Sequence, residues 1–128
     1  MAKKKIDPLN KKQYSAVSAM LTVSDVPAAV NFYQKAFGFS KRGIMNGPDG
    51  TPIHAELTLR GTTLMPGPEN AAMGKRTARS VGASPPGLYL YVENVDKVVE
   101  RATKLGATGQ GPVMDMFGAI ADSTAYRP

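Results

Sequence analysis

The stretch that decides the fold is LTVSDVPAAVNFYQKAFGF, residues 21–39. It continues an alternating run over residues 14–24 that is typical of a strand with one face on a core. Asp25 is then placed to cap a helix, and Pro27 lies in the first turn, where its missing N–H costs no hydrogen bond. Apolar residues recur on one helical face, and Gly38 is placed to end the helix. We predict a strand followed directly by a helix that covers its sheet.

Further strand patterns follow this helix. Residues 39–45 have the composition of a second strand, and residues 53–60 alternate again between apolar and polar side chains. The turn sequence NGPDG, residues 46–50, separates them. A short strand is expected over 63–65. Together these patterns predict a βαβββ module over residues 14–65.

The second half of the chain repeats the plan of the first. Residues 23–26 (VSDV) correspond to residues 92–95 (VENV), and a gap of one residue then brings Gly38 over Gly106. Duplication of this kind is the signature of a repeated structural unit. The sequence therefore predicts a second βαβββ-type module over 88–128. Its expected strands are 88–92, 107–113 and 116–122, and a proline- and glycine-rich linker or lid over 66–87 joins the modules.

Composition excludes several classes of protein. The 128 residues include no cysteine, which excludes a disulfide framework and a thiol nucleophile. There is neither an apolar run long enough to span a bilayer nor a secretory segment, so we expect a cytoplasmic protein without membrane contact. Much of the net charge of +6 comes from lysines in residues 1–13, which we expect to form a basic flexible tail. Because the basic residues are not spread over the folded body, we do not expect nucleic-acid binding.

The chain resembles the vicinal oxygen chelate superfamily of glyoxalases, bleomycin-resistance proteins and extradiol dioxygenases. The resemblance covers about residues 14–122 and rests on residues 21–39, on HAELTLRGTTLM (54–65) and on LYVENVDKVVERATKLGA (90–107). It implies an α+β fold in which two βαβββ modules form a curled mixed sheet, or cup, with the helices outside. Against that pattern, we expect the second module to be shortened at its C-terminal end. It also implies that the concave face of the cup binds substrate or drug.

The alternation of the strands identifies candidate ligand-binding residues without the resemblance. One face of each expected strand is apolar and suited to packing under a helix, as in Val17, Ala19, Leu21 and Val23. The opposite faces are polar, aromatic and sulfur-bearing, which suits a small organic ligand. A half-solvated sheet face is the alternative interpretation. The candidate ligand-binding residues are Ser18, Met20, Thr22, His54, Glu56, Met65, Tyr89 and Tyr91.

His54 and Glu56 are the candidates for catalysis, because residues i and i+2 of a strand point to the same side. A histidine beside a carboxylate can act as a general acid or base near neutral pH. Three roles stay open for the pair: metal-assisted catalysis, a polar contact to ligand, or a structural hydrogen bond. Two side chains are fewer than the three or four protein ligands that metal sites usually have.

The resemblance also implies where a metal would be bound. Metal-dependent members place a histidine or glutamine at the start of the first strand of each module, and those positions correspond here to Ser18 and Gly87. Neither residue can replace an imidazole for zinc, iron or nickel. We therefore expect no metal ligands and no cofactor, with a bound divalent metal as the lesser alternative.

Three functions stay open. The first is a glyoxalase/bleomycin-resistance-like protein, not an enzyme, that binds a small aromatic or cationic molecule without a metal; Glu56, Tyr89 and Tyr91 could hold a cation. The alternatives are a metal-dependent lyase, isomerase or dioxygenase of the glyoxalase type, and a non-catalytic interaction module. We also expect a homodimer, because an incomplete second sheet leaves strand edges unpaired.

Overall fold

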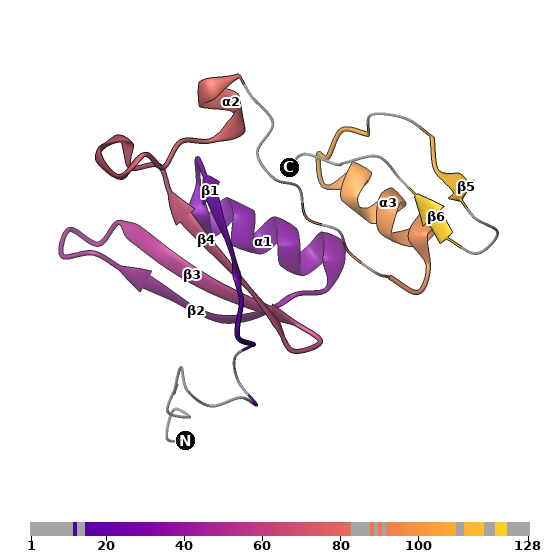
Figure 1. Ribbon diagram of the computed structural model, residues 1–128, viewed down its shortest axis with the longest axis horizontal. Coiled ribbons are helices and arrows are strands. Elements are labelled where there is room, and N and C mark those ends of the chain that lie inside the picture. Colours follow the sequence, from indigo (N-terminus) through magenta and orange to yellow (C-terminus); the bar gives the residue numbers. More distant parts are fainter. Residues whose placement is uncertain are drawn as a thin grey trace.

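The larger of the two described sheets is a mixed four-stranded sheet (Figure 1). The computed structural model describes residues 12, 15–82, 88, 90, 92–109, 112–116 and 120–122, the last strand residues 114–116 and 120–122 by their backbone alone. The sheet contains β1 (Ala19–Val23), β2 (Ser40–Asn46), β3 (Pro52–Leu59) and β4 (Thr62–Pro68) in the spatial order β1-β4-β3-β2. β1 is parallel to β4, and the other neighbours are antiparallel. The sheet is not closed, and with its helices it confirms the α+β class.

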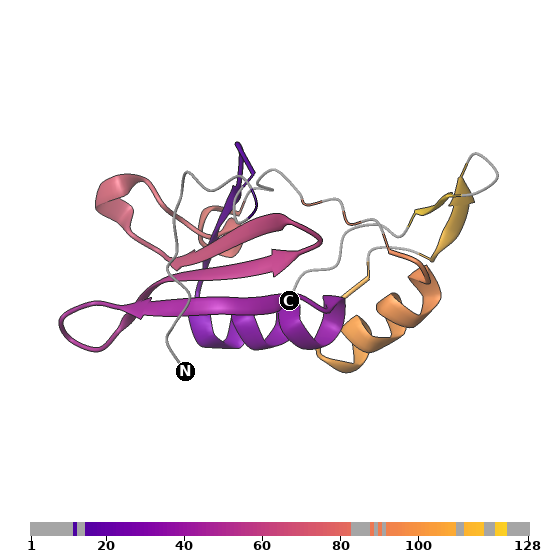
Figure 2. The same cartoon turned by 90° about the horizontal axis from the view of Figure 1, so that it is seen from below.

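Helix α1 (Val26–Phe37) covers one face of this sheet (Figure 2). It begins after Asp25, whose carboxylate accepts a hydrogen bond from the amide of Ala28 at 3.0 Å. It ends at Gly38, where φ is 79°, a left-handed conformation that glycine adopts without strain. Both ends lie where the sequence predicts them. The core that the helix shares with the sheet contains Val26, Ala29, Val30, Phe32, Tyr33, Ala36, Phe39, Ala55, Leu57 and Leu64.

Tight turns set the register of the antiparallel strands. Arg60 and Gly61 have φ of 47° and 81°, so both central residues of the β3–β4 turn are left-handed. That geometry matches the right-handed twist of a hairpin and brings Thr58 opposite Thr63. At the β2–β3 turn, the amide of Gly47 donates to the carbonyl of Thr51 at 2.8 Å. The turn expected at 46–50 is confirmed.

β1 is shorter than the alternation predicts. The strand begins at Ala19, which pairs with Leu64 of β4, and the expected helix-facing residues Leu21 and Val23 pack on the core. Val17 is 82% exposed, so its expected place under the helix is wrong. A period of two identifies the faces of a strand, but it does not say where the partner strand stops.

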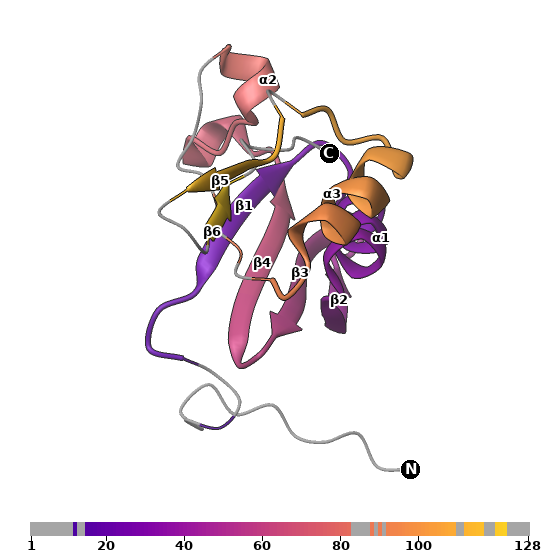
Figure 3. The same cartoon turned by 90° about the vertical axis from the view of Figure 1, so that its right-hand side faces the viewer.

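The helix α3 (Val95–Lys104) repeats the end signals of α1. The side chain of Asn94 accepts a hydrogen bond from the amide of Lys97 at 3.0 Å, and Gly106 has a φ of 99°. α3 packs beside α1 on the helix side of the sheet (Figure 3). In the part of the chain that the structure describes, no helix has the length and apolar character of a membrane span.

Small residues and one arginine join α3 to α1. Ala36 of α1 and Ala102 of α3 are fully buried. The guanidinium group of Arg101 donates to the carbonyl of Ala36 through Nη2 at 3.1 Å and through Nε at 3.3 Å. Ala36 lies in the last turn of α1, where carbonyls have no partner inside the helix. Arg101 therefore satisfies the end of the first helix from the second.

The second half differs from the expected strand order. Leu88, Leu90 and Val92 lie outside any strand, so the strand predicted over 88–92 is wrong at these described positions. Tyr89, Tyr91 and Gly87 lie outside the described residues. The strand expected over 116–122 is partly confirmed, because β6 (Ile120–Asp122) lies within it and pairs antiparallel with β5 (Met114–Met116). The strand expected over 107–113 is wrong at its described residues, and β5 begins just after it. Alternating apolar residues are a local signal, and a strand also needs a partner edge.

The segment expected as a linker or lid is partly regular structure. β4 continues through Pro68, and Pro66 is fully buried beside Leu21 of β1. The paired positions between β4 and β3 run from Thr62 to Leu64, so both prolines lie beyond that ladder. A missing N–H is tolerated where a strand has a neighbour on one side only. A 3-10 turn, η1 (Ala71–Met73), and a short helix, α2 (Ala78–Val81), follow.

Glu69 connects the end of β4 to the short helix α2. The hydroxyl of Ser80 and the amide of Thr77 both donate to Oε1 of Glu69, the amide at 2.8 Å. Arg76 lies 4.0 Å from the same oxygen. The hydrogen bonds from Ser80 and then from Thr77, with the charge of Arg76, lower the pKa of Glu69 to about 2. One carboxylate therefore holds the end of β4 against α2.

The depressed pKa predicts an acid-sensitive segment. Because the folded pKa of Glu69 lies below its ordinary value of 4.5, its contribution is fully present above pH 4.5 and is lost as the pH falls to about 2. In NMR spectra, the amide signal of Thr77 should titrate with a midpoint near pH 2. The Glu69→Gln variant should lack this transition, whereas Glu93→Gln should keep it. A wild-type midpoint near 4.5 would show that the carboxylate is not held.

Candidate functional site on the open face of the sheet

The face of the sheet turned away from α1 carries the candidate site, and we call it the open face. Ala55 and Leu57 are fully buried on the α1 side, so His54 and Glu56 point to the opposite side. The pairing then extends this assignment across the sheet. The open face holds Met20 and Thr22 of β1, Thr63 and Met65 of β4, His54, Glu56 and Thr58 of β3, and Gly43 and Met45 of β2.

The structure brings five of the eight candidate ligand-binding residues onto this face. They are Met20, Thr22, His54, Glu56 and Met65. Ser18 directly precedes β1 and has no strand partner that assigns it to a face. Tyr89 and Tyr91 lie outside the described residues. Ligand binding by these side chains stays a prediction, but five of them share one surface.

A charged row runs along the centre of the open face. Nη1 of Arg42 lies 3.1 Å from Oε2 of Glu56, and Nε2 of His54 lies 3.3 Å from Oε1 of Glu56. Arg42 also donates to the hydroxyl of Thr63 at 3.4 Å. The side chains of Arg42 and Glu56 are 18% and 17% exposed, and that of His54 is 31% exposed. Oε2 of Glu56 therefore contacts Arg42, and Oε1 contacts His54.

Arg42 is the member of this row that the sequence does not reveal. Simple alternation along β2 would place Arg42 on the same side as Ile44, which faces α1. The register shifts between Lys41 and Gly43, and this bulge lets Arg42 reach Glu56. A bulge depends on the pairing with β3, so no local pattern in β2 predicts it. The buried hydroxyl of Thr63, which is 0% exposed, is the other feature missed.

Arg42 determines the charge around Glu56. The sequence offers Glu56, with Tyr89 and Tyr91, as a group that could hold a cation, and in the structure its carboxylate forms an ion pair with Arg42. A second cation would have to compete with a guanidinium group that is held in place by two hydrogen bonds. The centre of the open face is therefore polar and close to neutral in charge, not acidic.

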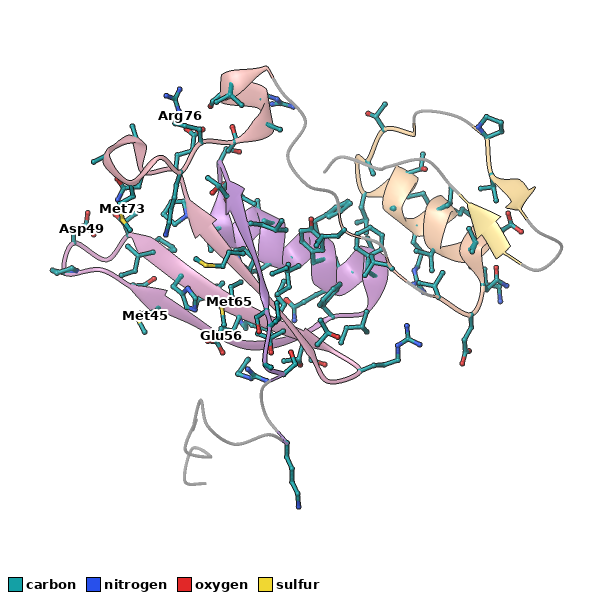
Figure 4. All side chains as sticks on the ribbon, in the orientation of Figure 1. Met45, Asp49, Glu56, Met65, Met73 and Arg76 are labelled. Atoms are coloured by element: carbon teal, nitrogen blue, oxygen red, sulfur yellow. The ribbon has the colours of Figure 1, made fainter. Side chains whose placement is uncertain are left out.

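Methionine side chains surround the charged row. Met20 and Met45 are 62% and 59% exposed, and Met65 is half-buried. Figure 4 labels Met45 on β2 and Met65 on β4. Exposed thioethers on a sheet face form an apolar surface that adapts its shape to what it contacts. The described residues contain no group of three or more histidine, cysteine, aspartate or glutamate side chains that could hold a metal ion. His54 and Glu56 are thus a hydrogen-bonded pair beside apolar surface.

The ion pair predicts a measurable coupling. In a double-mutant cycle of Arg42→Met and Glu56→Gln, the coupling energy from urea denaturation should be about 1 to 2 kcal/mol, because the pair is mostly removed from water. The matched control is the exposed pair of Lys104 and Glu100, whose side chains are 73% and 64% exposed. Its coupling should be far smaller, since water screens it. Equal couplings would contradict the central role of Arg42.

Known proteins share this architecture. An uncharacterized protein from Mycobacterium bovis is 36% identical over 115 residues, which cover 84% of this chain and 76% of that protein. A gene product of Arabidopsis thaliana has a TM-score of 0.64 and 26% identity, with 77% of this chain and 79% of that chain covered. TioX from Micromonospora has a TM-score of 0.59 and 23% identity, with 85% and 86% covered. At 23% identity, the similarity to TioX shows a shared fold and nothing more.

The family comparison covers nearly the whole described chain. The model of the Glyoxalase/Bleomycin resistance protein/Dioxygenase superfamily matches residues 15–122, from the residues before β1 to the end of β6. This agrees with the strand order and with the repeated helix signals of α1 and α3. The chain belongs to the glyoxalase/bleomycin resistance protein/dioxygenase superfamily.

Proposed function

We propose that the chain binds a small, flat organic molecule on the open face of the sheet and does so without a metal. The observation that carries this proposal is the row of Arg42, Glu56 and His54 bordered by exposed methionines. Ligand sites combine apolar surface with a few polar groups that fix orientation. Family membership supports the fold, and the residues of this face support the proposed ligand class.

The apolar part of the ligand is expected to lie on the thioethers. Covering Met20 and Met45 removes apolar surface from water, which contributes about 25 cal/mol per Å². An aromatic ring adds sulfur–ring contacts of about 0.3–1.5 kcal/mol each. The area contribution is the same for aliphatic and aromatic ligands of equal size, so the sulfur–ring contacts favour the aromatic one.

The charge of the ligand follows from the ion pair. Because Arg42 compensates Glu56, the face offers a cation little net attraction. An uncharged aromatic ligand with one hydrogen-bonding group fits better. The side chain of His54 is 31% exposed, so its ring can form a hydrogen bond with that group. We therefore favour the aromatic over the cationic class.

A screen for thermal stabilisation tests the proposal. A compound present at ten times its Kd should stabilise the chain by about 1.4 kcal/mol and raise Tm by about 5 °C. Uncharged aromatic compounds should give larger shifts than quaternary ammonium compounds. Elemental analysis of protein purified without chelator should find zinc, nickel, iron and manganese far below one per chain. One such ion per chain, or no shift with any aromatic compound, would contradict the proposal and favour metal-dependent chemistry of the glyoxalase type or an interaction module.

Matched variants show where the compound is bound. Met45→Ser removes a thioether from the open face, whereas Met73→Ser removes an equally exposed one from η1. The first variant should weaken binding at least fivefold and the second should not. Glu56→Gln and Glu93→Gln form a second pair, in which only the first change disturbs the charged row. Equal effects within either pair would place the ligand elsewhere.

We further propose that the chain forms a homodimer. In the described sheet, β1 and β2 are the outer strands, and no described strand pairs with their outer edges. An unpaired edge offers backbone groups to a second chain. Light scattering at tens of micromolar should give the mass of two chains. The mass of one chain across a dilution series would contradict this proposal.

A further inference from the structure

Soft metal donors gather on the open face. The chain has one histidine and seven methionines, and three of those methionines share this face with the histidine. We propose that Met45, His54 and Met65 form a binding site for a soft monovalent metal ion, Cu(I), with Met20 beside it. This site goes beyond the binding of an organic ligand, and it does not rest on that proposal.

The strand pairing brings these donors together. His54 of β3 pairs directly with Met45 of β2, and Met65 of β4 pairs directly with Met20 of β1. β3 and β4 pair at Leu57–Leu64 and Thr58–Thr63. Beyond this ladder β4 still lies beside β3, because a Cβ on Gly67 would lie 3.6 Å from the carbonyl oxygen of Ile53. Met65 follows Leu64 onto the open face, so it lies beside Glu56 and diagonal to His54. Direct neighbours have Cβ atoms about 4.5–5.5 Å apart, and diagonal neighbours at about 7–8 Å are still within reach of long side chains.

Glu56 prepares the histidine for a metal. Its carboxylate accepts a hydrogen bond from Nε2 of His54 at 3.3 Å, so that nitrogen carries the hydrogen. In the neutral imidazole, Nδ1 then keeps its lone pair and can bind a metal. A carboxylate on the second nitrogen of a metal-binding histidine is a recurrent arrangement that fixes the orientation of the ring. Arg42 holds Glu56 from the other side, so the histidine is positioned by a fixed group.

The donor set selects the ion. Thioethers are soft, uncharged ligands that favour Cu(I), and imidazole also binds copper. Zinc and nickel favour sites with more histidine, cysteine or carboxylate ligands, and the described residues contain no cluster of three. Two sulfur atoms and one nitrogen suit a monovalent ion, and the exposed fractions of Met45 and His54, 59% and 31%, leave them accessible.

Competition with a chromogenic chelator tests the site. The full chain is titrated anaerobically with Cu(I) in the presence of bicinchoninate, and Ag(I) serves as a redox-inert probe in native mass spectrometry. We expect one ion per chain and no comparable retention of Zn(II). Met45→Leu and Met65→Leu should each lower the Cu(I) affinity at least tenfold. Leucine keeps about the same apolar volume as methionine, so both variants should fold. Circular dichroism of each variant checks this.

Met73→Leu is the matched control, because Met73 is exposed but lies in η1, outside the open face. It should change the affinity less than twofold. Loss of Cu(I) to the chelator at every concentration would overturn the site, as would equal losses in Met73→Leu and Met45→Leu. The organic-ligand proposal is tested separately in metal-free buffer. There, Met45→Leu keeps an apolar surface and should retain most of the thermal shift, so that failure of one proposal does not count against the other.

Discussion

The burial of Leu57 against α1 is the constraint on which the other surfaces of the sheet depend. Leu57 and Ala55 are fully removed from water, and β3 alternates strictly, so their burial fixes Glu56 and His54 on the opposite face. A shift of one residue would place Glu56 under α1 without its partners, at a cost of several kcal/mol. The packing of one helix on one strand thus decides which residues a ligand can meet.

The ion pair of Arg42 and Glu56 then determines what that face can attract. A carboxylate at the centre of a sheet would attract cations, but the guanidinium group occupies one oxygen and His54 the other. Arg42 reaches this position because β2 bulges between Lys41 and Gly43. A local irregularity in an outer strand therefore changes the electrostatics of the strand beside it. Glu56 of this pair also orients the imidazole of His54. The carboxylate that is compensated by Arg42 is therefore the group that sets the direction of the ring.

The parts of the fold that the sequence predicts are those with local causes. The ends of α1 follow from the capping side chain of Asp25 and the left-handed Gly38, and the faces of β3 follow from its alternation. Arg42 could not be found this way, because a bulge is a property of two strands together. Likewise, Leu88, Leu90 and Val92 alternate as a strand would but lie outside any strand, and Pro66 lies inside one despite being a proline. Whether a segment forms a strand depends on whether another strand offers an edge to pair with. That edge comes from a distant part of the sequence, so no local pattern reveals it.

The polar and apolar parts of the open face would contribute differently to the two proposed ligands. The exposed thioethers of Met20 and Met45 contribute contact area without charge. The row from Arg42 to His54 contributes direction, since Glu56 fixes which imidazole nitrogen carries the hydrogen. A flat organic molecule would use the area and the outer edge of His54, whereas a soft ion would use the sulfur lone pairs and Nδ1. Competition between the two follows from this geometry, because both would contact the side chain of Met45.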